Sequence, residues 1–130
     1  MVLTYIDSSI ALAHLFAEPR QPRPDIWDRR LASSRLLEYE IFTRIHVRRP
    51  ALAGGAGLRA LLAGTALIEL SRPVLARVLE PWPVPVRTLD GLHLATVEYL
   101  RRQGETVELA SYDGRLLTAA QALGIALAAL

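Results

Sequence analysis

The chain has 130 residues, a formal net charge of +2, and a hydrophobic fraction of 52%. This length and composition are typical of one compact globular domain covering residues 1–130, with enough chain to bury a core without disulfides or a structural metal. All fifteen basic residues are arginine, and cysteine is absent, which excludes thiolate nucleophiles, cysteine-bound metals, Schiff-base lysines and P-loop lysines.

The first half of the chain predicts a strand, a polar turn and then several helices. Residues 2–6 form a β-branched and aromatic run, and the following Asp7-Ser8-Ser9 turn can cap a helix over residues 10–16. Prolines 19, 22 and 24 break the chain before a short helix over residues 25–31. Ser33 and Ser34 can then cap a longer helix that reaches about Arg49, before Pro50.

The second half alternates strands with helices. In chain order we expect a glycine-weakened helix over residues 51–63, a strand over 65–70, a helix over 71–79, an extended edge or loop segment over 82–86, a helix over 88–102, a strand over 107–111, a helix over 114–123 and a strand over 125–130. This alternation predicts an α/β fold with a mostly parallel sheet covered by helices on both faces.

The N-terminus and the most apolar stretch indicate where the protein resides. Residues 1–7 lack a basic start and reach a carboxylate at Asp7, which is unlike a signal peptide. Residues 51–70 are interrupted by Arg59, Glu69 and four glycines, which disfavours a membrane span. We therefore expect a cytoplasmic protein with no membrane contact.

Two acids stand where ligands bind in open α/β sheets, beyond the carboxyl ends of strands. Asp7 follows the first predicted strand, and Asp113 follows the strand over residues 107–111. Each also precedes a predicted helix, so capping by the aspartate is an equally good explanation for either residue alone.

Three further residues lie on predicted helices. Glu40 falls inside the apolar arc of its helix, near Val47, where a carboxylate needs a partner; an intrahelical pair with Arg44 is the simple alternative to metal binding. Asp90 lies in the first turn of the helix that Thr88 can cap, where the helix dipole alone accounts for an acid. His93 is best explained as a packed, hydrogen-bonded side chain.

Together the acids point to a metal site. Several carboxylates at one sheet edge repel each other unless a cation neutralises them, and oxygen ligands suit Mg²⁺ or Mn²⁺. Such ions promote phosphodiester hydrolysis by lowering the pKa of an attacking water, so no nucleophilic side chain is needed.

Four segments in register resemble the PIN-domain ribonucleases, and among them the VapC-type toxins of bacterial toxin–antitoxin pairs. YIDSS at residues 5–9 is similar to the opening strand and first acid of this family, and SSRLLEYEI at 33–41 to its serine-led helix with the second acid. LDGLHLA at 89–95 resembles the family's LDALHLA, with Gly91 in place of alanine, and SYDGRL at 111–116 resembles its TxDxxL ending, with Ser111 in place of threonine.

The resemblance implies a PIN-like three-layer sandwich and a Mg²⁺- or Mn²⁺-dependent endoribonuclease. It places Asp7, Glu40, Asp90 and Asp113 in a catalytic, metal-binding pocket, with Asp7 and Asp90 as direct ligands. Ser8 and Ser111 would hydrogen-bond the carboxylates or water.

The resemblance also implies a homodimer and a cognate antitoxin, whose C-terminal segment would fill the site with a basic residue among the acids. The apolar segments around residues 13–16 and 26–31 are places where it could dock, although core packing explains them better. Without the four proposed site acids, nine acids face fifteen arginines, a formal balance of +6 that suits an RNA substrate. Arg44, Arg87 and Arg115 lie nearest the motifs and are the predicted phosphate contacts.

Two other classes of function compete with a nuclease. A phosphoacceptor domain of the response-regulator kind also has strand-end acids, but it uses an acidic pair after the first strand and a lysine, and neither is present here. The other alternative is a PIN-like module that binds RNA or protein without catalysis, against which the complete set of acids argues.

Overall fold

The structure is a computed structural model that describes all 130 residues. Its centre is one sheet in which every neighbouring pair of strands runs parallel. The strands are β1 (Val2–Ile6), β2 (Leu31–Ser34), β3 (Thr65–Ile68), β4 (Thr106–Ala110) and β5 (Ala126–Leu127). The predicted parallel α/β sheet is confirmed.

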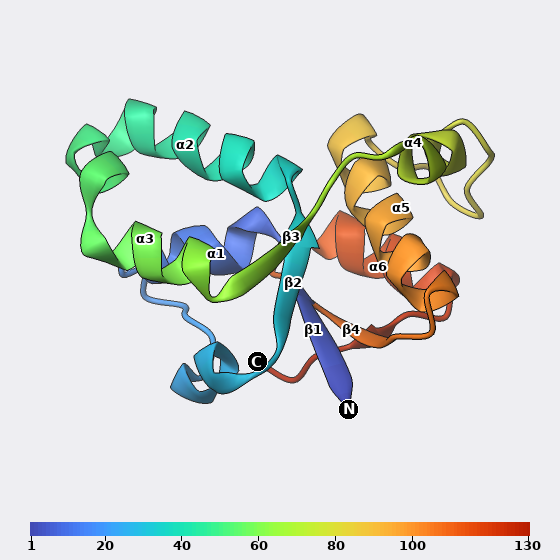
Figure 1. The fold of residues 1–130 in the computed structure, drawn as a ribbon, viewed down its shortest axis with the longest axis horizontal. Coiled ribbons are helices and arrows are strands. Elements are labelled where there is room, and N and C mark those ends of the chain that lie inside the picture. The colour runs from blue at the N-terminus through green and yellow to red at the C-terminus, as the bar shows by residue number, and fades with distance from the viewer.

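Helices cover both faces of the sheet, which makes three layers (Figure 1). Helices α1 to α3 lie on one side of the strands and α4 to α6 on the other. The helices are α1 (Ser8–Leu15), α2 (Leu36–Arg48), α3 (Ala56–Ala63), α4 (Arg72–Val78), α5 (Thr88–Arg102) and α6 (Gly114–Ala122), with two 3₁₀ turns, η1 (Pro24–Asp28) and η2 (Pro50–Gly54). No helix is both long and apolar enough to cross a membrane.

The strand order places the end of β1 at the topological switch point of the sheet. The order is β3-β2-β1-β4-β5, so the chain first builds outward from β1 on one side and then returns to its other side with β4. Ligands of open α/β sheets bind in the crevice at this point, beyond the strand ends. Receiver domains have the order 2-1-3-4-5, so the phosphoacceptor alternative does not fit this topology.

Two apolar clusters, one on each face of the sheet, hold the layers together. Strand β1 alternates between them, as the two-residue period of a strand requires: Leu3 and Tyr5 pack with α5 and α6, and Ile6 packs with α1 and α2. The last two side chains of this strand, Tyr5 and Ile6, are fully buried. The site-bearing helices are thus packed against the same strand from opposite sides.

The main error of the sequence prediction is strand β2. Residues 31–34 are predicted to end one helix and cap the next, but they form a fully buried strand that pairs with β1 and β3. Two serines in four residues conceal the apolar pattern of a buried strand. They are tolerated because Ser33 Oγ donates to the Ile6 carbonyl oxygen at 2.6 Å and Ser34 Oγ accepts from Leu36 N at 3.0 Å.

Smaller differences concern helix ends and short segments. The predicted helix over residues 51–63 is divided into η2 and α3 at Gly55, and the helix predicted over 25–31 is only the 3₁₀ turn η1. Residues 82–86 form a loop, and the last strand is two residues long. Thr88 is the first residue of α5 and makes no capping hydrogen bond, because the cap position is Arg87.

Candidate active site

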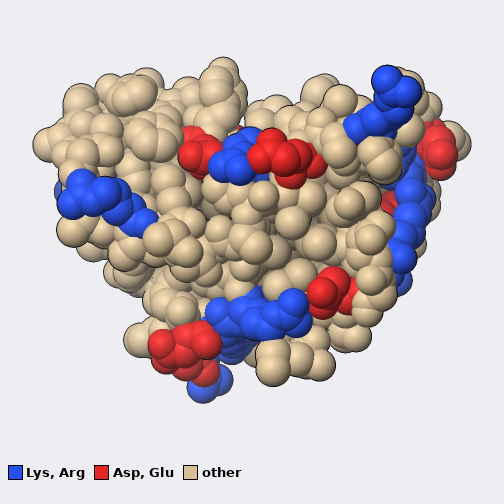
Figure 2. Space-filling model, in the orientation of Figure 1, with Lys and Arg blue, Asp and Glu red and all other residues tan.

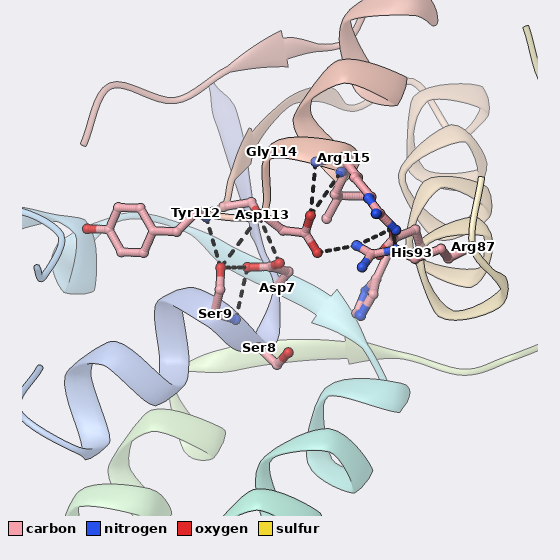
Figure 3. Close-up of polar contacts among 12 residues, drawn as sticks. Asp7, Ser8, Ser9, Arg87, His93, Tyr112, Asp113, Gly114 and Arg115 are labelled. Atoms are coloured by element: carbon pink, nitrogen blue, oxygen red, sulfur yellow. Dashed lines mark hydrogen bonds and ion pairs between the residues drawn. The ribbon is translucent and has the colours of Figure 1, made fainter. Parts of the chain in front are cut away.

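Asp7 and Asp113 stand at the switch point, and each caps a helix. Asp7 is the N-cap of α1 and accepts a hydrogen bond from Ser9 N at 3.2 Å. Asp113 is the N-cap of α6 and accepts from Arg115 N at 3.0 Å (Figure 3). The capping explanation is therefore correct for both residues, and it fixes both carboxyl groups at the same edge of the sheet.

Asp7 is the most enclosed acid of the site. Its side chain is buried, and its two oxygens accept hydrogen bonds from Ser9 Oγ at 2.6 Å and Ser111 Oγ at 2.8 Å. Burial raises the pKa of Asp7, and the hydrogen bonds from Ser9 and Ser111 oppose that rise. Ser111 Oγ also accepts from Asp113 N at 2.9 Å, so this hydroxyl ties the two strand-end acids together.

Glu40 is hydrogen-bonded to a histidine and not to Arg44, the partner considered as the alternative to metal binding. Its Oε1 lies 2.6 Å from His93 Nε2, and Ser8 Oγ is 3.4 Å from its other oxygen. Arg44 makes no ion pair with it, so the intrahelical pairing suggested by the sequence is absent. The predicted apolar arc is also too wide, because Val47 is 80% exposed whereas the Glu40 side chain is only 16% exposed.

Asp90 and Asp113 share one arginine. Arg87 Nε donates to Asp90 Oδ2 at 2.9 Å. Its Nη2 donates to Asp113 Oδ2 at 2.5 Å (Figure 3). The hydrogen bonds to Asp90 and then Asp113 raise the pKa of Arg87. The residue predicted to contact substrate phosphate is therefore engaged, in this structure, by two of the acids.

All four predicted acids line one cavity of about 450 Å³. A neighbouring cavity of about 400 Å³ shares Arg87 and Asp90 with it and adds Arg115, which places this arginine at the border of the site. Ser111 is buried and donates to Asp7, but it does not line the cavity. The lining of the first cavity is Asp7, Ser8, Ser9, Leu12, Glu40, Arg44, Arg87, Thr88, Leu89, Asp90 and Asp113.

The donor set of this cavity fits a hard divalent cation. Every acidic ligand offers oxygen, the ligand that Mg²⁺ and Mn²⁺ prefer. No three His, Asp or Glu side chains are arranged here to hold one ion together, since Arg87 engages Asp90 and Asp113 while His93 engages Glu40. Mg²⁺ commonly binds through one or two carboxylates and keeps several waters, so the four acids supply enough ligands without such a cage.

Sequence reasoning missed Ser9 and Tyr5. Ser9 bonds Asp7 and accepts from Tyr112 N at 2.9 Å; its position two residues after a capping aspartate was the available signal. Tyr5 lies within the predicted first strand, and nothing in the chain order shows that its hydroxyl reaches His93. His93 itself is buried and hydrogen-bonded, as predicted.

About half of the arginines are engaged by acids of the same chain. Seven of the fifteen arginines are in ion pairs with acids. On the face in Figure 2, basic and acidic side chains adjoin in the upper middle and at the bottom, and the group on the left is basic alone. The arginines without an ion pair are Arg20, Arg44, Arg49, Arg59, Arg72, Arg101, Arg102 and Arg115. Of these, Arg44 and Arg115 line the cavities at the site.

The apolar segments considered as docking places are part of the core. Phe16, Ile26 and Leu31 are buried in the cluster beneath α1 to α3. Trp27 is partly buried, and its ring lies against the His14 ring with 4.5 Å between the ring centroids and a tilt of 44°. Core packing therefore explains Phe16 and Ile26, as the sequence favoured, whereas Trp27 and Leu31 also line a cavity of about 270 Å³ beside His14.

Comparisons with known proteins find two curated relatives that align with almost the whole chain. Ribonuclease VapC46 of Mycobacterium tuberculosis strain ATCC 25618 / H37Rv is 34% identical, and the match covers 99% of this chain and 98% of the relative. Ribonuclease VapC47 of Mycobacterium tuberculosis strain CDC 1551 / Oshkosh is 27% identical, and the match covers 94% of this chain and 93% of the relative. No family model matches the chain, and no solved structure matches it.

Proposed function

Because this chain belongs to the VapC family of PIN-domain ribonucleases, we propose that it is the toxin of a toxin–antitoxin pair and a Mg²⁺- or Mn²⁺-dependent endoribonuclease. The observation that carries the proposal is the convergence of Asp7, Glu40, Asp90 and Asp113 on one cavity at the switch point of the sheet. These acids come from four separate segments of the chain, and helix capping explains only two of them.

The four acids differ in the roles that their surroundings permit. Asp90 and Asp7 are the proposed direct ligands, and both face the cavity. When bound, a divalent cation there would lower the pKa of an attacking water and stabilise charge on the phosphate. Ser9 and Ser111 hold the Asp7 carboxylate in place, and Ser8 contacts Glu40.

Three arginines at the two cavities are the proposed contacts of the RNA backbone. Arg44 lines the acidic cavity from α2, and Arg115 lines the adjoining cavity from α6. Arg87 stands between these positions. Positive side chains on both sides of an acidic centre suit a polyanionic strand whose scissile phosphate lies over the acids.

The proposed antitoxin would inhibit the enzyme by placing a basic side chain among the acids. Arg87 supports this, because its own guanidinium bridges Asp90 and Asp113, as the basic side chain of an antitoxin would. A small DNA-binding protein encoded beside this gene is the expected partner. Absence of such a reading frame would count against the toxin–antitoxin assignment while leaving the nuclease assignment intact.

The test of the nuclease is cleavage of single-stranded and looped RNA by the purified full chain, without antitoxin, with added Mg²⁺ or Mn²⁺. Chelation and the Asp90→Asn substitution should each abolish cleavage. Asp28→Asn, which changes an exposed acid of η1, is the matched control and should cleave as wild type does. Undiminished cleavage by the Asp90 variant would refute the proposed site, and light scattering of the same sample tests the expected homodimer.

A further inference from the structure

Two buried rings connect the core of the protein to Glu40. The Tyr5 hydroxyl, from β1, lies 2.7 Å from His93 Nδ1 in α5, and His93 Nε2 lies 2.6 Å from Glu40 Oε1 in α2. The exposed fractions of Tyr5 and His93 are 0% and 2%. The two rings meet edge to face, with 5.7 Å between their centroids and an angle of 81° between their planes. We call Tyr5, His93 and Glu40 the Tyr–His–Glu relay.

The surroundings of the relay determine where its protons lie. Burial raises the pKa of Tyr5, so its hydroxyl keeps its proton and can donate it. The two hydroxyls beside it donate elsewhere, Ser33 Oγ to the Ile6 carbonyl and Thr96 Oγ1 to the Leu92 carbonyl. Donation from Tyr5 to Nδ1 leaves the ring proton of a neutral histidine on Nε2, where it points at the Glu40 carboxylate.

Glu40 needs this support more than the other acids of the cavity do. Asp7 is held by two serines, Asp113 by the backbone of α6, and Asp90 by Arg87. The longer Glu40 side chain has only one other side-chain hydrogen bond, from Ser8 Oγ at 3.4 Å. Without His93, a glutamate with several rotatable bonds would lose its one short hydrogen bond at the cavity wall.

We propose that Tyr5 and His93 are positioning residues, which act through Glu40 by fixing one of its carboxylate oxygens so that the other is presented to the cavity. This inference rests on the proposed function, because it assigns the relay to the same acidic site. A ring that served only to fill the core would not require a carboxylate partner at the cavity wall.

Two amide substitutions at position 93 separate positioning from packing. The amide nitrogen of glutamine in His93→Gln can take the place of Nε2 and donate to Glu40. The shorter amide in His93→Asn can reach only the place of Nδ1, so it retains a partner for Tyr5 and loses Glu40. Val97→Ala, at a buried position of α5 in the apolar cluster, is the control for destabilisation without loss of the relay.

Mn²⁺ affinity of the full chain, measured by calorimetric titration, is the main measurement. His93→Asn should weaken Mn²⁺ binding by about 10- to 100-fold, the usual effect of removing an outer hydrogen-bond partner of a metal ligand. His93→Gln should recover most of the affinity, and Val97→Ala should bind as wild type does. The comparison applies if the wild type binds Mn²⁺ and the Asp7→Asn variant does not. Equal Mn²⁺ affinities of His93→Gln and His93→Asn would then refute the positioning role of the relay.

A measurement on the wild type keeps the inference testable if both substitutions prevent folding. Nitrogen-15 NMR of the His93 ring should show a protonated Nε2, and an Nε2 without a proton would refute the relay. A wild type that binds no Mn²⁺ at all would instead overturn the proposed function first, and this inference with it.

Discussion

Replacement of Asp7 by asparagine should separate the stability of the fold from metal binding. The Asp7 carboxyl is buried, and its pKa is raised above its ordinary value of 3.8 because burial disfavours the charged form. Each pKa unit of such a rise corresponds to about 1.4 kcal/mol of stability lost when the group ionises. The substituted asparagine carries no charge, so this loss disappears in the variant.

The gain in stability from removing the charge is offset by the loss of one hydrogen bond. Asparagine can still accept at the oxygen that meets Ser9, but its amide nitrogen replaces the oxygen that accepts from Ser111. That loss costs about 1 kcal/mol. We therefore expect Asp7→Asn to lose less stability at pH 7 in a chelating buffer than the broken hydrogen bond alone would cost.

The pH dependence gives the sharper signature. Because the folded pKa of Asp7 is raised, its favourable contribution is fully present below the unfolded pKa and is lost as pH rises through the folded pKa. The stability of Asp7→Asn relative to wild type should therefore increase with pH across this window and stay constant above it. Asp28→Asn, at an exposed acid, should show no such trend.

Added metal should stabilise the wild type but not Asp7→Asn. At a metal concentration 100 times Kd, binding stabilises the folded wild type by about 2.7 kcal/mol. At about 4 °C per kcal/mol for a domain of this size, the expected rise in Tm is about 10 °C. Asp7→Asn should show little or no rise, because it lacks a proposed direct ligand.

Thermal melts followed by circular dichroism, with chelator and with Mn²⁺ over a pH series, measure both effects. An Asp7→Asn protein that gains as much Tm from Mn²⁺ as wild type would remove Asp7 from the metal site. A stability difference that falls with increasing pH would refute the electrostatic argument, whatever the metal does.

Three further substitutions concern helix α5, which carries Asp90, and two arginines of the site. Gly91→Ala should raise stability by about 1 kcal/mol, since a Cβ there meets only ordinary contacts of 3.6 Å or more; thermal melts should show a higher Tm and cleavage should be unchanged, whereas a lower Tm would reveal a clash. Arg44→Ala should reduce the slope of log K against log salt for single-stranded RNA by about 0.7, and Arg102→Ala, which lies outside the acidic cavity, should leave the slope unchanged. Arg87→Ala should tighten Mn²⁺ binding several-fold in the absence of RNA, because the substitution releases two carboxylates. The same variant should bind RNA more weakly. Weaker Mn²⁺ binding would show that the arginine supports the metal site instead of competing for it.

The order of the elements could be predicted because most of them carry a strong local signal. The sequence predicts helix α5 with the bounds observed, Thr88–Arg102, and β1 with the observed Val2–Ile6. Strand β2 is missed because its stability comes from pairing with both neighbours and from the hydrogen bonds of Ser33 and Ser34, and the pairing is not local in sequence. Tertiary contacts override local propensity at such a segment.

The site, like the fold, has a part that the sequence predicts and a part that depends on tertiary contacts. Positions after strands and on an apolar helix face were sufficient to single out Asp7, Glu40 and Asp113. The partners of these acids were not predictable, because His93 reaches Glu40 across 53 residues of sequence and Arg87 reaches Asp113 across 26. A sequence shows which residues are costly to bury, whereas the identity of the group that compensates each one depends on packing.

Four acids around one cavity create an electrostatic problem that this chain solves in several ways. Asp7 is stabilised by hydroxyl donors, Asp113 by helix N–H groups as well as Arg87, and Glu40 by a histidine. Only Arg87 brings a full positive charge to two of the acids at once. A guanidinium can do this because its nitrogens lie in a planar fork, whereas an ammonium is a single point charge. The absence of lysine therefore does not weaken this site: the one cation that bridges two of its acids is of the kind whose geometry can bridge them.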